Sequence, residues 1–197
     1  MSGALRSHAS MARLSEYAPR IFQALDIGVG GLGLVREALA GIDHFELPLA
    51  HRDQGRWILV IPKKLESPNK TVWGHWRALS RERKAWDGLL RVAIANAHGR
   101  LSTTGLRESG AWSAPTERMR LTVFRFVASR RQFIRDDDNL AFALKHANDA
   151  LKSVGLVRDD DRAWLAQSLP QQDLSPIAGH PVTVFVLQPD PSTRSNS

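Results

Sequence analysis

The chain has 197 residues, of which 43% are hydrophobic and 24% are charged, a composition typical of a soluble globular protein with one domain and an extension. It has no cysteine, which excludes disulfides, thiolate metal sites and a cysteine nucleophile, and it has no apolar run long enough to cross a membrane. The formal net charge is +7, but residues 51–135 carry 18 basic and 6 acidic side chains, whereas residues 136–161 carry 3 basic and 7 acidic ones. A basic surface around an acidic focus is what a metal-dependent nuclease needs, although the two charges can also simply neutralise each other across the fold.

The first 50 residues differ in composition from the rest of the chain. They are nearly neutral, rich in Ala, Gly and Leu, and lack the apolar core of a signal peptide, so we expect a cytoplasmic protein. Gly28, Gly30 and Gly33 fit the G-x-G-x-x-G pattern of dinucleotide sites, but no βαβ unit is completed around them. We therefore expect an N-terminal extension (1–50), poorly packed or helical, with a glycine hinge, and keep a dinucleotide-dependent enzyme as an alternative.

A buried strand and a basic helix are predicted next. The run Trp57–Pro62 is continuously apolar and is ended by its proline. A long helix from Val72 to Ala97 carries an apolar stripe. Beside this stripe, helical spacing brings four cations onto one face: Arg77, Arg81, Lys84 and Arg91. That face is either simply solvated or in contact with a phosphate backbone.

The remaining predicted elements are a Gly-, Ser- and Thr-rich loop or loose hairpin (98–117), a strand (120–128), a basic connector (129–135), a helix (140–154) that Gly155 ends, and a last strand (182–187). This order predicts an α+β fold, with a small mixed β-sheet of three to four strands packed against two main helices. The folded domain is expected to span residues 51–188, and a disordered tail (189–197) to follow it.

Two groups of aspartates flank the second predicted helix. Asp136, Asp137 and Asp138 precede it, with Asn139 as its expected N-cap, and a second group, Asp159–Asp161, follows its end. An extended backbone at 136–138 would point the first and third carboxylates to the same side. One acid is enough to complement a helix dipole, whereas three repel one another, and Mg²⁺ is a cation that prefers such ligands. Taken alone, the second group is best explained as a turn with a helix cap, and the alternative is that the short return after Gly155 brings it back towards the metal.

The ordered set of motifs resembles the RusA-type Holliday junction resolvases, a family common in phages and prophages. That family has Asp-x-Asp-Asn at the start of a helix, a lysine within it, Asp-Ala-Leu, then Gly and paired aspartates. The matching residues here are Asp136-Asp-Asp138-Asn139, Lys145, Asp149-Ala-Leu, Gly155 and Asp159-Asp160, preceded by Ile61-Pro62, Ser67-Pro-Asn69 and the basic helix. The resemblance covers about residues 57–187 and does not reach residues 1–50.

The resemblance implies roles for particular residues. Asp136, Asp138 and Asp160 would be catalytic carboxylates that bind Mg²⁺, and Lys145 would stabilise or position the scissile phosphate. Asn69 and Lys70 would lie in a DNA-facing loop. Candidates for contacts with the DNA backbone are Arg77, Arg81, Lys84, Arg130 and Arg131. Two departures stand out. The segment between Asn139 and Asp149 is about one helical turn longer than in the family, so Lys145 lies deeper in the helix, although still on the face of Asp138, and the loop 98–117 is longer than expected.

The expected function is a Mg²⁺-dependent endodeoxyribonuclease that resolves four-way junctions by paired symmetric nicks in DNA recombination and repair. Each cut would leave a 5′-phosphate and a 3′-hydroxyl, as the resemblance implies. Because a four-way junction needs two symmetry-related cuts, one active site per chain predicts a twofold homodimer. The alternatives are a nuclease for other branched DNA and a non-catalytic DNA-binding module on the same fold.

Overall fold

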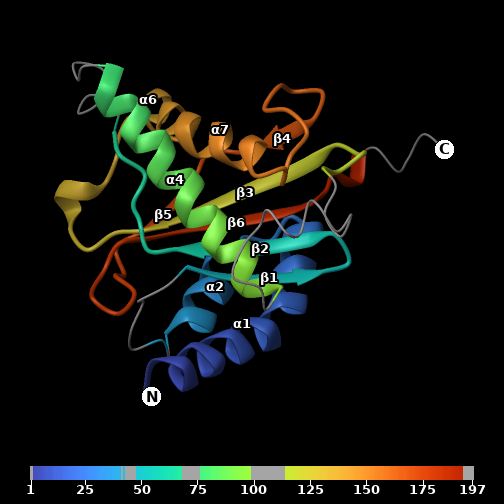
Figure 1. The fold of residues 1–197 in the computed structure, drawn as a ribbon, viewed down its shortest axis with the longest axis vertical. Coiled ribbons are helices and arrows are strands. Elements are labelled where there is room, and N and C mark those ends of the chain that lie inside the picture. The colour runs from blue at the N-terminus through green and yellow to red at the C-terminus, as the bar shows by residue number, and fades with distance from the viewer. Residues whose placement is uncertain (1, 41, 43–47, 68–75, 99–113, 193–197) are drawn as a thin grey trace.

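The computed structural model of the chain describes residues 2–40, 42, 48–67, 76–98 and 114–192 (Figure 1). Its elements are α1 (Ser2–Asp26), α2 (Leu32–Leu39), β1 (Leu49–Asp53), β2 (Arg56–Ile61), α4 (Trp76–Ala97), β3 (Met119–Phe126), the 3₁₀ turn η1 (Arg130–Gln132), α6 (Asp137–Ala143), α7 (Lys145–Ser153), β4 (Leu165–Gln167), β5 (Gln171–Asp173) and β6 (Val182–Pro189). The long loop predicted at 98–117 lies almost entirely outside the described residues.

The strands form one mixed sheet in the order β1-β2-β6-β3-β4, and β5 also pairs with β3. Strand β6 runs antiparallel to both β2 and β3, whereas β4 and β5 run parallel to β3. This confirms the predicted α+β fold with a mixed sheet, but the expected three to four strands were too few, since the sheet has six. The missed strands β1, β4 and β5 have five, three and three residues, too short to show an apolar periodicity.

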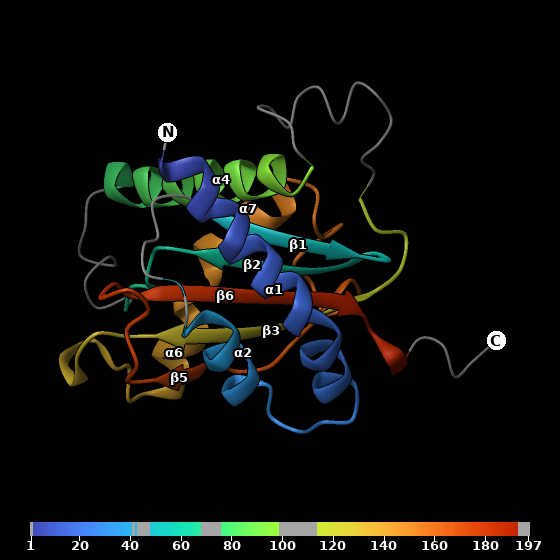
Figure 2. The same ribbon diagram turned by 90° about the horizontal axis from the view of Figure 1, so that it is seen from below.

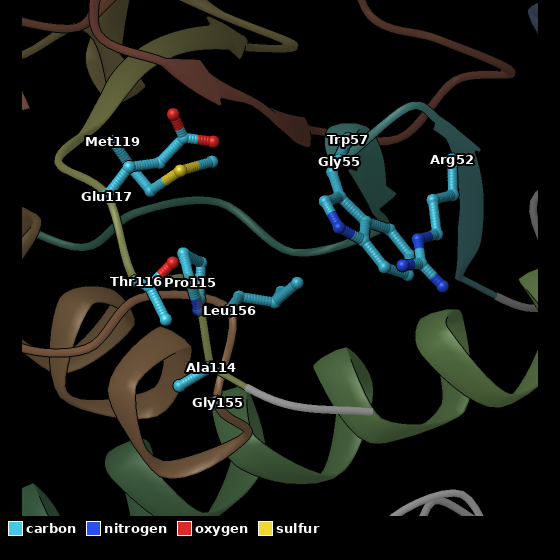
Figure 3. Close-up of a pocket in the computed structure, with 10 residues that line it drawn as sticks. All are labelled: Arg52, Gly55, Trp57, Ala114, Pro115, Thr116, Glu117, Met119, Gly155 and Leu156. Atoms are coloured by element: carbon cyan, nitrogen blue, oxygen red, sulfur yellow. The ribbon is translucent and has the colours of Figure 1, made fainter. Parts of the chain in front are cut away.

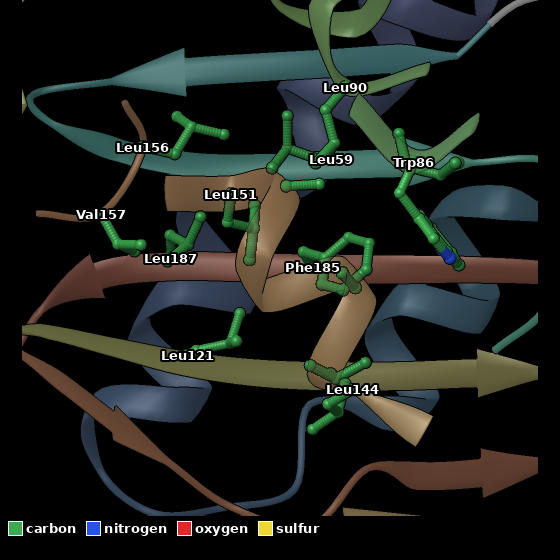
Figure 4. Packing of buried hydrophobic residues seen from close by; sticks show 14 of the residues in the cluster. Leu59, Trp86, Leu90, Leu121, Leu144, Leu151, Leu156, Val157, Phe185 and Leu187 are labelled. Atoms are coloured by element: carbon green, nitrogen blue, oxygen red, sulfur yellow. The ribbon is translucent and has the colours of Figure 1, made fainter. Parts of the chain in front are cut away.

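Helices cover both faces of the sheet (Figures 1 and 2). Helices α4, α6 and α7 lie on one face, and α1 and α2 lie on the other. Because side chains alternate along a strand, β6 serves both layers. Phe185 and Leu187 pack with the α4–α7 layer, as Figure 4 shows, and Val184 and Val186 pack with the α1–α2 layer. The acidic motif at the start of α6 belongs to the α4–α7 layer, which is one of the two helical layers.

The N-terminal residues belong to the folded core, so the expectation of a poorly packed extension was wrong and its helical alternative is confirmed. Leu14, Ala18, Ile21 and Phe22 of α1 are each at most 1% exposed and pack on the sheet. The end of the helix is fixed by Asp26, which accepts hydrogen bonds from Arg56 of β2 (3.2 Å), Arg120 of β3 (3.1 Å) and Gln188 of β6 (2.8 Å).

The glycine motif connects two helices. Gly28 has φ +73° at the end of α1, a conformation that favours glycine, and α2 begins at Leu32. The dinucleotide alternative needs a strand before this turn, and the structure has the 25-residue helix α1 there, so the glycines form a turn between two helices and not a dinucleotide-binding loop.

The end of the chain differs from the prediction of a tail that starts at residue 189. Strand β6 includes Pro189, and Asp190 is buried and forms an ion pair with Arg118 at 3.3 Å. Residues 193–197 lie outside the described part. Among the described helices, none combines the length and the apolar character that a membrane span requires.

Candidate functional site

The acidic motif forms the start of α6. Asp136 is the N-cap, with an extended backbone (φ −96°, ψ 123°), and its Oδ1 accepts a hydrogen bond from the backbone N–H of Asn139 at 3.1 Å. Asp137 and Asp138 lie in the first turn, and all three carboxylates are exposed. The helix dipole favours negative charge at this end, so the three acids are partly stabilised where they stand.

Two predictions about this motif were wrong. The N-cap is Asp136 and not Asn139, since the helix begins three residues earlier than expected. The backbone at Asp137 and Asp138 is therefore helical, and the argument from an extended segment 136–138 does not apply. The predicted helix 140–154 is also divided, because α6 ends at Ala143 and α7 begins at Lys145.

A pocket of about 290 Å³ opens beside the start of α6. Its walls are the loop after β2 and the loop that joins η1 to α6. It is lined by four cations, two carboxylates and five other residues: Lys64, Arg125, Arg131, Arg135, Glu66, Asp136, Ser67, Gln132, Phe133, Ile134 and Asn139. The pocket thus combines an excess of positive charge with the capping carboxylate of the acidic motif.

The second acidic group lies beyond the end of α7. Lys152 contacts Asp159 at 2.7 Å and Asp160 at 3.6 Å. The hydrogen bond from Lys152 is the main reason that the pKa of Asp159 is lowered to about 2. Asp161 accepts hydrogen bonds from the backbone N–H groups of Ala163 (2.8 Å) and Trp164 (3.2 Å), so it caps a turn, as one of the two interpretations of this group predicted.

The two acidic groups lie at opposite ends of the α6–α7 pair. Leu144, which joins the helices, keeps a right-handed helical backbone (φ −74°, ψ −19°), and α6, α7 and β4 follow one another across the molecule (Figure 1). At 1.5 Å per residue, Asp138 and Lys152 are roughly 20 Å apart along this axis. Within the part of the chain that the structure describes, no three His, Asp or Glu side chains form a group that could hold a metal ion. Within one chain, the structure therefore does not bring Asp160 together with Asp136 and Asp138, as the predicted ligand set expected.

The other predicted site residues are placed as follows. Lys145 is exposed just after the break between α6 and α7, and its Nζ lies 5.7 Å from the ring centroid of Phe142. Arg81 and Lys84 are exposed on α4, and Arg130 and Arg131 are exposed in η1. The backbone of Arg77 lies in α4, whereas Asn69 and Lys70 lie outside the described residues.

One cation of the predicted basic face is paired with an acid. Arg91 binds Asp87 one turn before it on α4, with Nε 2.7 Å from Oδ2. That salt bridge and a hydrogen bond from Ser153 to Asp87 outweigh the effect of burial and lower the pKa of Asp87. Arg91 thus links α4 to α7 and is not equivalent to the exposed Arg81 and Lys84.

Sequence reasoning missed most of the cations and one carboxylate of the pocket. Lys64 and Glu66 lie in a loop without a motif, and Arg135 was counted only as part of a basic connector. Arg125 had a usable signal, because it is a charged residue between two phenylalanines in the interior of a mainly apolar strand.

A second pocket, of about 220 Å³, lies between the β1–β2 turn and the start of β3 (Figure 3). Arg52 lies over the ring of Trp57 at 5.5 Å on one side of it, and Gly155 and Leu156 line the other. None of the predicted catalytic residues lines this pocket.

Comparisons with known proteins add no family assignment. No protein-family model matches the chain, and no curated protein has a matching sequence.

Proposed function

We propose that this protein is a Mg²⁺-dependent, structure-specific endodeoxyribonuclease that resolves four-way DNA junctions by paired nicks in recombination and repair, working as a cytoplasmic, nucleoid-associated homodimer. The observation that supports the proposal best is the pocket that joins Asp136 to Lys64, Arg131 and Arg135. The four-way junction as substrate and Mg²⁺ as metal are proposed from the ordered motifs that resemble the RusA-type resolvases.

The charges of this pocket suit a phosphodiester next to a carboxylate. Lysine and arginine side chains bind phosphate oxygens by charge-assisted hydrogen bonds, and arginine does so with two parallel donors. A phosphate held by Arg131 and Arg135 would lie beside Asp136 and close to the first turn of α6, where Asp138 stands. Carboxylates alone repel DNA, so the surrounding cations are needed to bring the backbone to them.

The exposed cations outside the pocket extend this surface. Arg130 adjoins the pocket in η1, and Arg81, Arg83 and Lys84 are exposed on α4. Contacts from such residues to phosphates fix the position of DNA and do not read its sequence. This agrees with an enzyme that recognises the shape of a branched substrate.

The homodimer is part of the proposal for two reasons. Paired cuts in a four-way junction need two active sites related by twofold symmetry. In addition, one chain keeps Asp160 apart from Asp136 and Asp138, and the proposed twofold dimer is one whose interface places the second acidic group of one copy at the α6 start of the other. Each of two identical sites would then have carboxylates from both copies.

Nicking of a synthetic mobile four-way junction, compared with linear duplex of the same sequence, tests this proposal. We expect paired nicks on the junction with Mg²⁺ and none with EDTA. Asp138→Asn should abolish nicking, whereas the matched variant Asp137→Asn, which removes the same charge from the same helical turn, should keep most of it. Cleavage of linear duplex at the same rate, or equal loss in both variants, would contradict the proposal.

A non-catalytic DNA-binding module is the second candidate. Its support is that the described residues of one chain assemble no group of three carboxylates or imidazoles for a metal ion. Junction binding by the wild-type protein without any Mg²⁺-dependent nicking would favour this candidate. Faster cleavage of flaps or forks than of four-way junctions would instead indicate a nuclease for other branched DNA.

A further inference from the structure

A buried arginine links the two walls of the pocket beside α6. Arg125 of β3 is 2% exposed, and its side chain points to the same face of the sheet as Leu121 and Val123, where α6 and α7 lie. Its Nε and Nη2 donate to the carbonyl oxygen of Leu65 at 3.2 and 3.0 Å, and Nη2 also donates to the carbonyl oxygen of Gln132 at 2.6 Å. Leu65 belongs to one wall and Gln132 to the other.

Gln172 of β5 completes the link. Its Oε1 accepts from Arg125 Nη1 at 2.7 Å and from the backbone N–H of Ile134 at 3.1 Å, and its Nε2 donates to the carbonyl oxygen of Ile134 at 2.8 Å. Both backbone groups of Ile134 are therefore held by one side chain, two residues before the capping Asp136. The side-chain oxygen of Gln132 in turn accepts a hydrogen bond from the backbone N–H of Ala128 at 2.9 Å, which joins the start of the 128–132 segment to its end.

The cost of this arrangement argues that it has a purpose beyond filling the core. Burying a guanidinium is expensive, and an apolar side chain of similar volume would occupy the same place without a desolvation penalty. Burial lowers the pKa of Arg125 to about 10, partly offset by Glu66, so the group still carries its charge at neutral pH. The positive charge lies at the inner wall of a pocket that already collects Lys64, Arg131 and Arg135.

We propose that Arg125 and Gln172 are positioning residues, which hold the loop carrying Arg131, Arg135 and Asp136 in the geometry that receives a DNA phosphate. The inference rests on the proposed nuclease function and deepens it, because it says what shapes the phosphate subsite before DNA binds. Gln172 does not line the pocket, and the hydrogen bonds of Arg125 go to oxygens of Leu65, Gln132 and Gln172. A loop without such support would have to be ordered by the substrate, which costs binding free energy.

The chain provides a matched control for Gln172. Gln167 lies on β4, the other three-residue strand that runs parallel to β3, and its Oε1 accepts from Asn148 Nδ2 at 2.6 Å. Gln167→Met and Gln172→Met thus each remove a side-chain amide that links a short strand to another element. Only Gln172 contacts residues that line the pocket, namely Arg125 and Ile134.

Two measurements on the full-length chain test the proposal. Hydrogen exchange of residues 127–136 should speed up in Gln172→Met and stay unchanged in Gln167→Met. The maximal nicking rate on a four-way junction should fall by about 10- to 100-fold in Gln172→Met, since small displacements of catalytic groups have effects of this size, while Gln167→Met retains the wild-type rate. Gln172→Glu keeps the acceptor for Arg125 and for the Ile134 N–H, so it should recover much of the lost rate.

The outcomes separate this proposal from the proposed function. Unchanged exchange at residues 127–136 in Gln172→Met would overturn the positioning role, whatever the activity. Faster exchange with an unchanged nicking rate would overturn it too, because the loop would then not need to be held. A wild-type protein that binds junctions but never nicks them would overturn the nuclease, and the positioning role would stand only if Gln172→Met also weakened junction binding.

Discussion

At the scale of single residues, Asp136 has two separable roles. Its Oδ1 caps α6 through the N–H of Asn139, and its carboxylate is one of the two, with Glu66, that line the pocket. Asparagine caps a helix about as well as aspartate but carries no charge. Alanine carries no charge either, and it does not cap the helix. The two substitutions therefore separate stability from chemistry.

We predict that Asp136→Asn keeps the wild-type free energy of unfolding and loses junction nicking. Asp136→Ala should lose nicking and also about 1 kcal/mol of stability, as is usual for a lost N-cap. Urea unfolding and the junction assay on the two variants check this. Nicking by Asp136→Asn at the wild-type rate would show that the carboxylate serves only as a cap.

A second residue-scale prediction concerns His51, which connects β1 to α1. Its Nδ1 lies 2.9 Å from Ser15 Oγ, and burial lowers its pKa despite the opposing charge of Asp53. The unfolded chain therefore binds a proton at this group more readily than the folded chain does. The stabilising effect of neutral His51 is present above pH 6.5 and is lost as the pH falls through its lowered pKa. Between pH 7.5 and 5.5, the free energy of unfolding should fall less in His51→Asn than in the wild type, and an equal fall in both would contradict the assignment.

The residue-level errors have a physical explanation. Asp136, Asp137, Asp138 and Asn139 are all good N-caps, so composition alone does not choose among them. In the structure, both backbone groups of the preceding Ile134 are bonded to Gln172, which lies 38 positions away in the sequence. Such a long-range contact leaves no local pattern, which is why the cap was misplaced although the acidic motif itself was recognised.

At the scale of elements, α1 is as much part of the fold as the helices that carry the acidic motif. Phe22 is 1% exposed between α1 and the sheet, and the guanidinium carbon of Arg56 on β2 lies 5.5 Å from the centroid of its ring. We predict that Phe22→Ala lowers the free energy of unfolding by about 3–5 kcal/mol, as for other buried aromatic residues. The neighbouring exposed Gln23→Ala should change it by less than about 0.5 kcal/mol. Equal urea midpoints for the two variants would mean that α1 does not contribute to the cooperative fold.

The sequence predicted the long elements better than the short or neutral ones. Strands β2, β3 and β6 were placed to within about two residues, because continuous apolar runs mark strands that are buried on both faces. Helix α1 was underestimated, since its high alanine content and neutral charge hid a helical period at Leu14, Ala18, Ile21 and Leu25. Strands β4 and β5 depend on β3 for their conformation and had no signal of their own.

At the scale of the whole molecule, the placement of the two acidic groups decides how many chains make one site. Lys152 holds Asp159 and Asp160 at the far end of α7 from Asp138. If all these carboxylates serve one metal-dependent site, the site must be assembled from two copies of the chain. If Asp160 has no catalytic role, Asp160→Asn alone should nick at the wild-type rate.

Mixed dimers distinguish these possibilities. We predict that Asp138→Asn and Asp160→Asn homodimers are both inactive, and that a heterodimer with one substitution on each chain regains single nicks, because one of its two shared sites is intact. Such a heterodimer should not resolve the junction, since resolution needs both cuts. The matched control places both substitutions on one chain and pairs it with a wild-type copy. If the sites are shared between chains, this control is inactive, because each of its two sites receives one substituted residue. If each site lies within a single chain, the control nicks through its wild-type copy, and the first heterodimer is inactive. Differently tagged, co-expressed chains purified over both tags provide the two heterodimers for the assay.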